Sequence, residues 1–213
     1  MTQAPAKPSR QAAHLARRRA ELIAAAQHTV AESGPEAPIE QFAADAGVSI
    51  ATLYKHFGSK DGLLAAAAID GQQRWEAWMA VTVSVLPTEI EQFVAAGRLV
   101  LRGHELQPEL ASMGARVLAT TRIDLGILVS EMSARVERLV AEGIVRSDQT
   151  DLRIRLYLAC LINEFVRQAS LPKTKPDEAD AVVELALALL GITPARAKKL
   201  VRAPLPPLGE IPQ

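Results

Sequence analysis

The sequence is poor in several residue types, and each shortage excludes a class of protein. It has one cysteine in 213 residues, so no internal disulfide can form and a disulfide-framed secreted domain is excluded. Aromatic residues make up only 4% of the chain, so small aliphatic side chains must fill the core, which favours helices over a β-sandwich. The longest Ala/Leu-rich run, Leu63 to Ile69, is far shorter than the roughly 18 apolar residues of a membrane span. The first thirty residues also lack the apolar core of a signal peptide, so we expect a cytoplasmic protein with no membrane partner.

The chain also lacks net charge, because 24 Lys and Arg residues balance 24 Asp and Glu residues. A generally basic polymer-binding protein is therefore excluded, and any contact with nucleic acid must be local. Positive charge is concentrated between positions 7 and 19, where no acidic residue occurs. This arm is expected to contact DNA phosphates or the minor groove, the alternative being a solvated surface. Its basic residues are Lys7, Arg10, Arg17, Arg18 and Arg19.

Residues for catalysis or metal binding are missing as well. No glycine-rich phosphate loop, nucleophile elbow or paired-carboxylate pattern is present, so we predict that the protein is not an enzyme and uses no cofactor. Cys160 stands alone on an apolar stretch and is expected to be a buried structural thiol rather than a redox sensor. The four histidines, which share no metal-ligand spacing, are His14, His28, His56 and His104.

What the sequence does contain is a succession of amphipathic helices, with hydroxyl or acidic caps at their starts and Gly or Pro at their ends. We predict an all-α fold of nine or ten helices. One long helix is predicted over about 114–142, and another over 174–190 with Thr174 as its cap. The alternating stretch 81–85 is interpreted as a helix end, because a single strand would have no partner. The Pro-rich ends, residues 1–11 and 203–213, are predicted to be disordered.

Residues 39–57 have the spacing of a helix-turn-helix motif. Apolar residues at i, i+3, i+4 and i+7 predict a helix over 39–46, which Gly47 ends. A second short helix is predicted over 50–57, with Ser49 as its N-cap and Gly58 after its end. A helix, a three-residue break and a short helix are typical of DNA-binding modules.

The second of these helices has two chemically different faces. A rotation of 100° per residue places Leu53, Phe57, Ile50 and Tyr54 on an apolar face, and Ala51, Thr52, Lys55 and His56 on the other. Thr52 and Lys55 carry donors and acceptors that can reach base edges, and the small Ala51 lets the backbone come close to DNA. We therefore predict that this helix contacts the bases.

The same segment, GVSIATLYKHFGSKDGLL at 47–64, resembles the DNA-binding signature of the TetR family of bacterial transcriptional regulators. The preceding helix and the pattern Arg19-x-x-Leu22-Ile23-x-Ala25-Ala26 also resemble that family, so the resemblance covers about fifty residues. It implies contacts with DNA phosphates. The positions that would make them are Ser49, Tyr54, His56 and Lys60.

Two of these positions have a structural alternative, and two further positions depart from the family pattern. Tyr54 has a structural alternative as a packing tyrosine, and His56 as a buried, hydrogen-bonded histidine. Pro38 stands where the family usually has a hydroxyl residue that caps the helix and contacts phosphate. Ile50 stands where a polar residue is frequent, and it could meet a thymine methyl or pack.

The resemblance further implies a second domain that holds a small-molecule effector and forms a homodimer. We place the DNA-binding domain at 12–58 and this second domain at 59–202. Apolar walls for an effector are expected at Trp75, Trp78, Phe93 and Met113, although two tryptophans three residues apart are also typical of core. Polar groups within the apolar helices are costly to bury without partners, and these candidates are Arg98, Arg102, Arg116, Arg122, Asp124, Asn163 and Glu164.

The sequence therefore predicts a TetR-like repressor that binds a pseudo-palindromic double-stranded DNA operator as a homodimer and that a small-molecule effector releases. The helices over about 150–170 and 174–190 are apolar around more of their circumference than one buried stripe requires, which predicts a four-helix dimer interface. The alternative is an all-α scaffold or adaptor protein whose helix-turn-helix is only structural. Salt-dependent binding to bulk DNA would separate the two.

Overall fold

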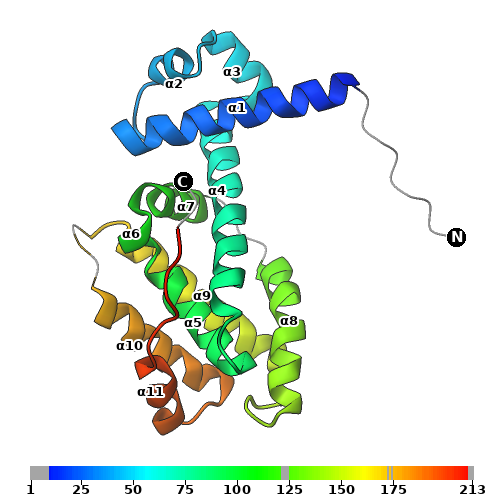
Figure 1. Ribbon diagram of the computed structural model, residues 1–213, viewed down its shortest axis with the longest axis vertical. Helices are drawn as coiled ribbons and strands as arrows, with labels where there is room; N and C mark the ends of the chain where they lie inside the picture. Colours follow the sequence, from blue (N-terminus) through cyan, green and yellow to red (C-terminus); the bar gives the residue numbers. More distant parts are fainter. Residues whose placement is uncertain (1–9, 121–124, 172, 174, 211–213) are drawn as a thin grey trace, which may run out of the picture. The chain divides into compact units, whose positions relative to one another are not determined.

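The computed structural model describes residues 10–120, 125–171, 173 and 175–210, and all regular structure in these ranges is helical (Figure 1). The chain divides into two compact units, Met1–Gly71 and Gln72–Gln213. The first unit contains α1 (Arg10–Ser33), α2 (Ile39–Asp45), α3 (Ile50–Phe57) and the beginning of α4 (Lys60–Val83). The second contains the rest of α4, followed by α5 (Glu89–Leu101), α6 (Gly103–Leu106), α7 (Pro108–Thr120), α8 (Leu125–Ala141), α9 (Thr150–Gln168), α10 (Pro176–Leu187), a 3₁₀ turn (Ala188–Leu190) and α11 (Pro194–Arg202).

The all-α prediction is confirmed, with eleven α-helices in the described ranges rather than nine or ten. The two additional helices lie between 103 and 142. The short α6 was not predicted, and the single helix expected over 114–142 corresponds to α7 and α8, with 121–124 outside the described residues. Pro108 is the first residue of α7, a position that suits proline because its missing N–H has no partner there. None of the helices described is long and apolar enough to span a bilayer.

The core of the first unit is formed by one face of each of its helices. From α1, Leu22, Ala26 and Val30 are at most 2% exposed, and their spacing of four places them on one stripe. The buried Thr29 of α1 donates its hydroxyl proton to the Asp45 carboxylate at 2.7 Å and contacts the Ala25 carbonyl at 3.0 Å. These contacts satisfy the Thr29 hydroxyl inside the core, and the bond to Asp45 ties α1 to the end of α2. Other core side chains of this unit are Phe42, Leu53, Leu63 and Leu64.

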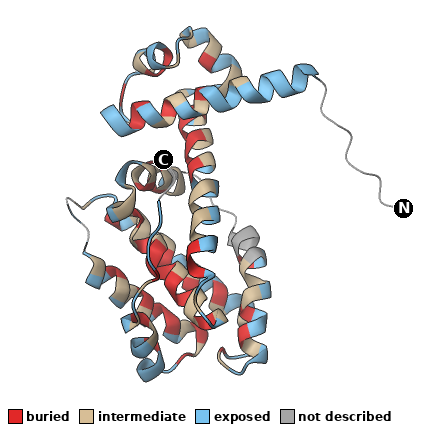
Figure 2. Cartoon of the chain, in the orientation of Figure 1, coloured by how far each residue is buried: buried red, intermediate tan, exposed pale blue. Residues whose placement is uncertain are grey.

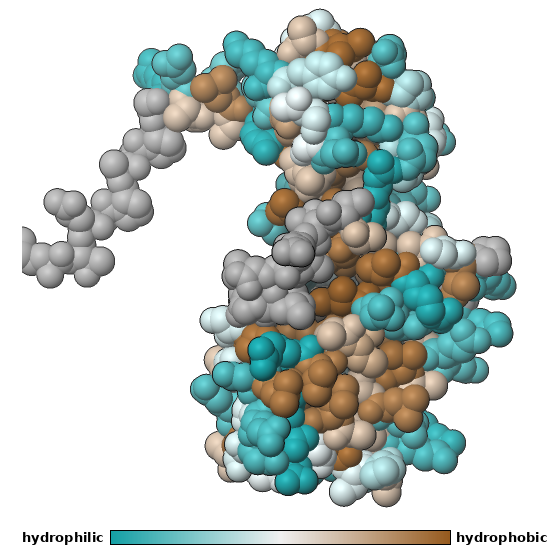
Figure 3. Space-filling model, turned by 180° about the vertical axis from the view of Figure 1, so that it is seen from behind, coloured by the Kyte–Doolittle hydropathy of each residue, from teal (hydrophilic) through white to brown (hydrophobic). Residues whose placement is uncertain are grey.

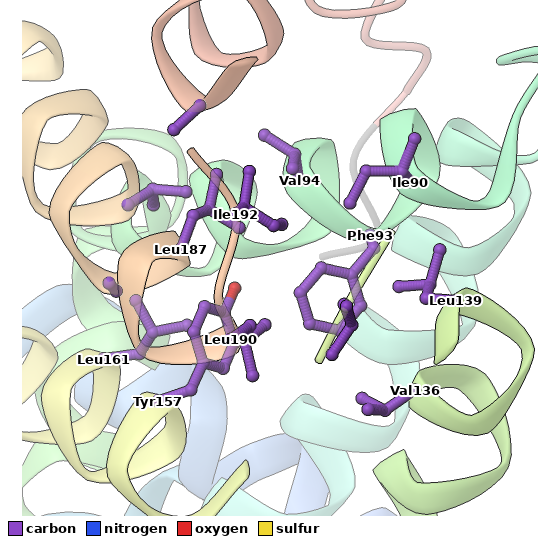
Figure 4. Close-up of a cluster of buried hydrophobic side chains, with 14 of the residues drawn as sticks. Ile90, Phe93, Val94, Val136, Leu139, Tyr157, Leu161, Leu187, Leu190 and Ile192 are labelled. Atoms are coloured by element: carbon purple, nitrogen blue, oxygen red, sulfur yellow. The ribbon is translucent and has the colours of Figure 1, made fainter. Parts of the chain in front are cut away.

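The core of the second unit is larger and lies where α5, α8, α9, α10 and α11 meet (Figure 4). Phe93 of α5 and Tyr157 of α9 form its aromatic centre, with ring centroids 5.3 Å apart. Gly97 is required beside them, because a Cβ atom there would lie 2.7 Å from the Tyr157 hydroxyl. A smaller cluster on another side of α5 has Val83, Ala95 and Leu99 as its buried members, with Trp75 and Trp78 packed against them. Helix α5 therefore has core on more than one side, as the buried positions in Figure 2 illustrate.

A buried ion pair joins α5 to α10. Arg98, which is 6% exposed, donates from Nε and Nη2 to the two Asp180 carboxylate oxygens at 3.0 and 2.9 Å. Arg102 donates to the same carboxylate at 2.8 Å. Because a buried guanidinium needs an acceptor for each donor, the third Arg98 donor, Nη1, is also used. It contacts the Ala203 carbonyl at 2.7 Å.

The segment that follows α11 is not free of the fold, which corrects part of the prediction that residues 203–213 are disordered. Residues 203–210 form no helix or strand, but Ala203 accepts the hydrogen bond from Arg98. Leu205 packs against the smaller cluster, and Pro206 is buried. Composition alone did not predict these contacts, because they join residues far apart in the sequence, as Arg98 and Ala203 are. At the other end, residues 1–9, including Lys7, lie outside the described residues.

Candidate nucleic-acid interface

Two glycines and a serine fix the ends of α3. Gly47 has φ +61° and Gly58 has φ +77°, values that cost little only for glycine. The Ser49 side chain accepts a hydrogen bond from the Thr52 amide at 3.2 Å and so caps the helix. At the other end the Gly58 amide donates to the Tyr54 carbonyl at 2.8 Å. The predicted boundaries of this helix, Ile50 and Phe57, are confirmed.

One face of α3 anchors it to the rest of the unit. Leu53 is 2% exposed, while Ile50 and Phe57 are half-buried. The Arg19 guanidinium of α1 lies 4.6 Å from the centre of the Phe57 ring, a cation–π geometry. Spacing along the sequence did not predict this contact, although Arg19 is part of the pattern in α1 that resembles the family. The apolar face thus holds α3 in a fixed orientation.

The other face of α3 is open to solvent. Ala51 and Lys55 are exposed, and Thr52 and His56 are half-buried. Tyr54, which the 100° rotation placed on the apolar face, is 44% exposed. The packing alternative for this tyrosine therefore has little support, and its hydroxyl is available for contacts outside the chain.

Thr52 is less free than its position suggests. Its hydroxyl lies 2.9 Å from the Ser49 hydroxyl, and the two share one hydrogen bond. A contact with a base edge must replace that bond, whereas the methyl group of Thr52 is not engaged in it. Lys55 makes no ion pair among the described residues and is exposed, so it can contact a base without losing a partner.

The turn from α3 into α4 places Lys60 at the first position of α4. Ser59 caps this helix by accepting a hydrogen bond from the Gly62 amide at 3.0 Å. The Lys60 ammonium lies 5.7 Å from the centre of the Phe42 ring, so its side chain runs towards α2. A Cβ atom at Gly62 would collide with the Phe57 carbonyl, which explains why the turn can be this tight.

Helix α2 begins without the side-chain cap that the family usually has at this position. Its N-cap is Pro38, with φ −64° and ψ 152° and no side-chain hydrogen bond.

The basic residues of α1 lie near the start of that helix and are exposed or half-exposed (Figure 2). Arg18 pairs with Glu21 at 3.0 Å within the same helix, a surface pair of small energetic effect. The described part of the predicted arm consists of Arg10, Arg17, Arg18 and Arg19.

The residues predicted to line an effector site do not all come together. The Trp75 and Trp78 rings lie 4.8 Å apart in the smaller cluster, whereas Phe93 belongs to the larger core. Met113 is 1% exposed, Arg116 is half-buried, and Asn163 is exposed on α9. Of the other polar candidates, Arg98 and Arg102 pair with Asp180 and Glu164 pairs with Arg167, while Arg122 and Asp124 lie outside the described residues.

Metal and thiol chemistry find no support in the described part of the chain. No three His, Cys, Asp or Glu side chains are grouped there as metal ligands would be. Cys160 is half-buried rather than fully buried. Burial, together with the nearby charge of Glu164, raises the pKa of its thiol, so the reactive thiolate is disfavoured.

The first unit therefore is a helix-turn-helix module: a short helix with one anchored face and one open polar face, preceded by a glycine break and a second short helix. Residues 22–67 match the family described as "Bacterial regulatory proteins, tetR family". Within the first unit, residues 22–67 thus resemble the DNA-binding domain of the TetR family, and the whole chain has the fold of a TetR-family transcriptional regulator.

Solved structures support this assignment of the fold over the length of the chain. RolR without ligand is 20% identical, with a TM-score of 0.72 over 89% of this chain and 100% of that one. RolR in complex with resorcinol is also 20% identical, with a TM-score of 0.71 over 93% and 100%. A TetR-family transcriptional regulator from Pectobacterium atrosepticum is 22% identical, with a TM-score of 0.66 over 86% and 94%. No curated protein matches the sequence.

Proposed function

We propose that the protein is a cytoplasmic transcriptional repressor that binds a double-stranded DNA operator as a homodimer and leaves it when a small molecule binds. The observation that carries the proposal is the open polar face of α3, where Ala51 and Lys55 are exposed, while the buried Leu53 anchors the opposite face. In this proposal the protein acts by binding rather than by catalysis.

Base edges and phosphates are contacted by different residues of the interface. Lys55 and Thr52 contact base edges in the major groove, with Ala51 allowing the close approach. Ser49, Tyr54, His56 and Lys60 contact phosphate oxygens and fix the position of α3 on the duplex. Lys60 is well placed for this because the free N–H groups at the start of a helix also favour an anion.

Dimerisation is assigned to α9 and α10, which pack against each other. Both expose large apolar side chains: Leu152 is 41% exposed and Leu156 47% on α9, and Leu185 is 73% exposed on α10. Figure 3 shows that hydrophobic side chains also gather on the rear of the second unit. Exposed apolar surface on adjacent helices supports a self-complementary interface in which two helices of each copy form a four-helix bundle.

The effector is assigned to the second unit. One neighbour of similar fold, RolR, is known in complex with resorcinol, a small molecule that combines an apolar ring with polar groups. We infer an effector of the same general kind for this chain, an apolar or amphipathic small molecule. If it favours a state that cannot bind DNA, operator DNA must weaken effector binding by the same factor.

Selection of binding sites from random double-stranded DNA tests the proposal. A pseudo-palindromic consensus with half-sites about one helical turn apart, 34–36 Å, is expected from a two-fold dimer. Binding to the selected site is expected to weaken steeply with salt, because phosphate contacts release counterions. Absence of any enriched sequence, with no salt-dependent binding to bulk DNA, would support the scaffold alternative instead.

A further inference from the structure

The segment after α11 packs against the smaller apolar cluster of the second unit. We call residues 203–208, Ala-Pro-Leu-Pro-Pro-Leu, the C-terminal strap. In Figure 1 it runs as an extended red segment away from α11. Its Leu205 packs against the smaller cluster of Val83, Ala95 and Leu99, against which Trp75 and Trp78 also pack. The strap therefore covers part of the same apolar surface as the two tryptophans.

The strap is held at one point by a polar contact. The Ala203 carbonyl accepts a hydrogen bond from Arg98 Nη1 at 2.7 Å. The other Arg98 donors are fixed by Asp180, so the guanidinium cannot turn to another acceptor without breaking the pair. If the strap leaves, Nη1 loses its partner in a buried environment, which is costly unless another acceptor takes its place.

The composition of the strap suits reversible docking. Its prolines, Pro204, Pro206 and Pro207, restrict the backbone to extended conformations, so less conformational entropy is lost when it docks. Proline also has no N–H, so docking leaves fewer backbone donors unpaired. Pro-rich extended segments bind aromatic-lined apolar surfaces in other proteins for the same reasons. The contacts of one leucine, one proline and one hydrogen bond are few enough to open locally while the rest of the unit stays folded.

We propose that the C-terminal strap is a releasable lid, and that its release opens a binding site between Arg98 and the cluster that contains Trp75 and Trp78. The ligand of this site has an apolar, aromatic body that replaces Leu205 and a carbonyl, carboxylate or sulfonate oxygen that replaces the Ala203 carbonyl. Because the two replaced groups belong to residues whose Cα atoms are about 7 Å apart at most, a body of one or two rings fits. This inference rests on the effector binding proposed for the second unit and gives it a location, whereas its test measures dye binding and does not depend on α3 or on DNA.

The probe for the test is 1-anilinonaphthalene-8-sulfonate, which has an aromatic body and one anionic acceptor group. Four full-length proteins are compared: the unchanged chain, Leu205→Asp, Pro206→Ser and Leu208→Asp. Leu208 lies in the strap but is 40% exposed, so Leu208→Asp is a matched control. Energy transfer from the tryptophans, which are the only two in the chain, reports dye bound near them rather than elsewhere.

We expect Leu205→Asp and Pro206→Ser to bind the dye more tightly than the unchanged chain, while Leu208→Asp binds like the unchanged chain. A lid that is closed in about nine molecules of ten lowers the apparent affinity about tenfold, so its release restores that factor. A synthetic peptide of residues 203–210 is expected to displace the dye from Leu205→Asp, and the same peptide carrying that substitution is not.

Equal dye affinity in all four proteins, or equal displacement by both peptides, would overturn the proposal. The proposal would also be overturned if Pro206→Ser had the same tryptophan emission, dye affinity and thermal unfolding as the unchanged chain. Circular dichroism shows whether a variant has lost helix. If Leu205→Asp has lost helix, the dye affinities of Pro206→Ser and Leu208→Asp are compared instead.

Discussion

The exposed Lys55 and the hydrogen-bonded Thr52 differ in what each can contribute to base recognition. We expect Lys55→Ala to weaken operator binding by about 1–3 kcal/mol and to relax the preference at particular base pairs. Thr52→Ala should cost less, towards the lower end of that range, because the Thr52 hydroxyl must first give up its bond to Ser49. Binding to the selected operator and to single-base variants of it, followed by fluorescence anisotropy, measures both effects.

Lys60→Ala is the control for this prediction, because Lys60 is assigned to a phosphate. It should weaken binding to operator and random DNA alike and reduce the salt slope by about one. Equal losses on operator and random DNA for Lys55→Ala would contradict its assigned contact with bases.

Gly62 permits the tight turn between α3 and α4. A Cβ atom added at Gly62 would collide with the Phe57 carbonyl. A backbone carbonyl at a helix end cannot move aside as a side chain can. Gly62→Ala is therefore expected to lower the free energy of unfolding of the chain by about 1–3 kcal/mol, the usual cost of overpacking. It should also weaken DNA binding, because Lys60 and the end of α3 must shift. Urea unfolding followed by circular dichroism measures the first effect.

Gly209 provides a matched control, since a Cβ atom there meets nothing within 4 Å. Gly209→Ala should leave both the unfolding free energy and DNA binding unchanged. If Gly62→Ala unfolds like Gly209→Ala, the turn is looser than the structure shows.

At the scale of elements, a charged contact links the start of α5 to α8. Glu89 accepts hydrogen bonds from Arg135 at 2.8 Å and Arg138 at 3.1 Å. Burial alone would raise the pKa of Glu89, but the hydrogen bonds and positive charges of the two arginines outweigh it, so the pKa is lowered from its ordinary value of 4.5. The ionised form therefore favours the folded state above pH 4.5, and this contribution is lost as the pH falls through the lowered pKa.

Glu89→Gln removes the charge and keeps the shape of the side chain. At neutral pH we expect it to lower the free energy of unfolding by about 1 kcal/mol, the upper part of the range for half-exposed pairs. The difference from the unchanged chain should shrink as the pH falls through the lowered pKa of Glu89, which urea unfolding at several pH values can follow. Glu178→Gln, which breaks the more exposed pair with Lys175, should have a smaller effect. A difference that stays constant with pH would contradict the role assigned to the charge.

Some elements could be predicted from the sequence because their signals are local. The boundaries of α3 follow from Ser49 and Gly58, whose capping and positive φ are properties of those residues themselves. The pairing of Arg98 with Asp180 joins residues 82 positions apart, and spacing along one helix cannot indicate such a partner.

The candidate site shows the same limit. The open face of α3 could be predicted from a 100° rotation, except for Tyr54, which lies near the boundary between the two faces and is exposed. The effector residues could not be grouped, because whether Trp75 and Phe93 meet depends on how α4 and α5 pack. In the structure they belong to different clusters.

At the scale of the whole molecule, the proposed dimer makes the exposed leucines of α9 and α10 essential. Leu156→Asp together with Leu185→Asp is expected to give a monomer by analytical ultracentrifugation. Burying one leucine contributes about 1.5–3 kcal/mol, and two-fold symmetry repeats each loss. The dimer should therefore weaken by at least about 3 kcal/mol, more than a hundredfold in the dissociation constant. Tight binding to a full operator should be lost with it.

Val85→Asp is the control, because Val85 is 69% exposed but lies outside α9 and α10. It should leave the dimer intact. A double variant that remains dimeric would move the interface to another surface of the chain.

The division of labour within α3 has a consequence for how this protein can change. Leu53, Ile50 and Phe57 pack against the rest of the first unit, whereas Ala51 and Lys55 are exposed and contribute little to the stability of the fold. Exposed positions of this kind usually tolerate substitution within about 0.5 kcal/mol of stability. In the proposed interface, mutation at these two positions can therefore alter which DNA sequence is recognised while the chain stays folded. New operator preferences are thus accessible by single steps, in evolution as in the laboratory.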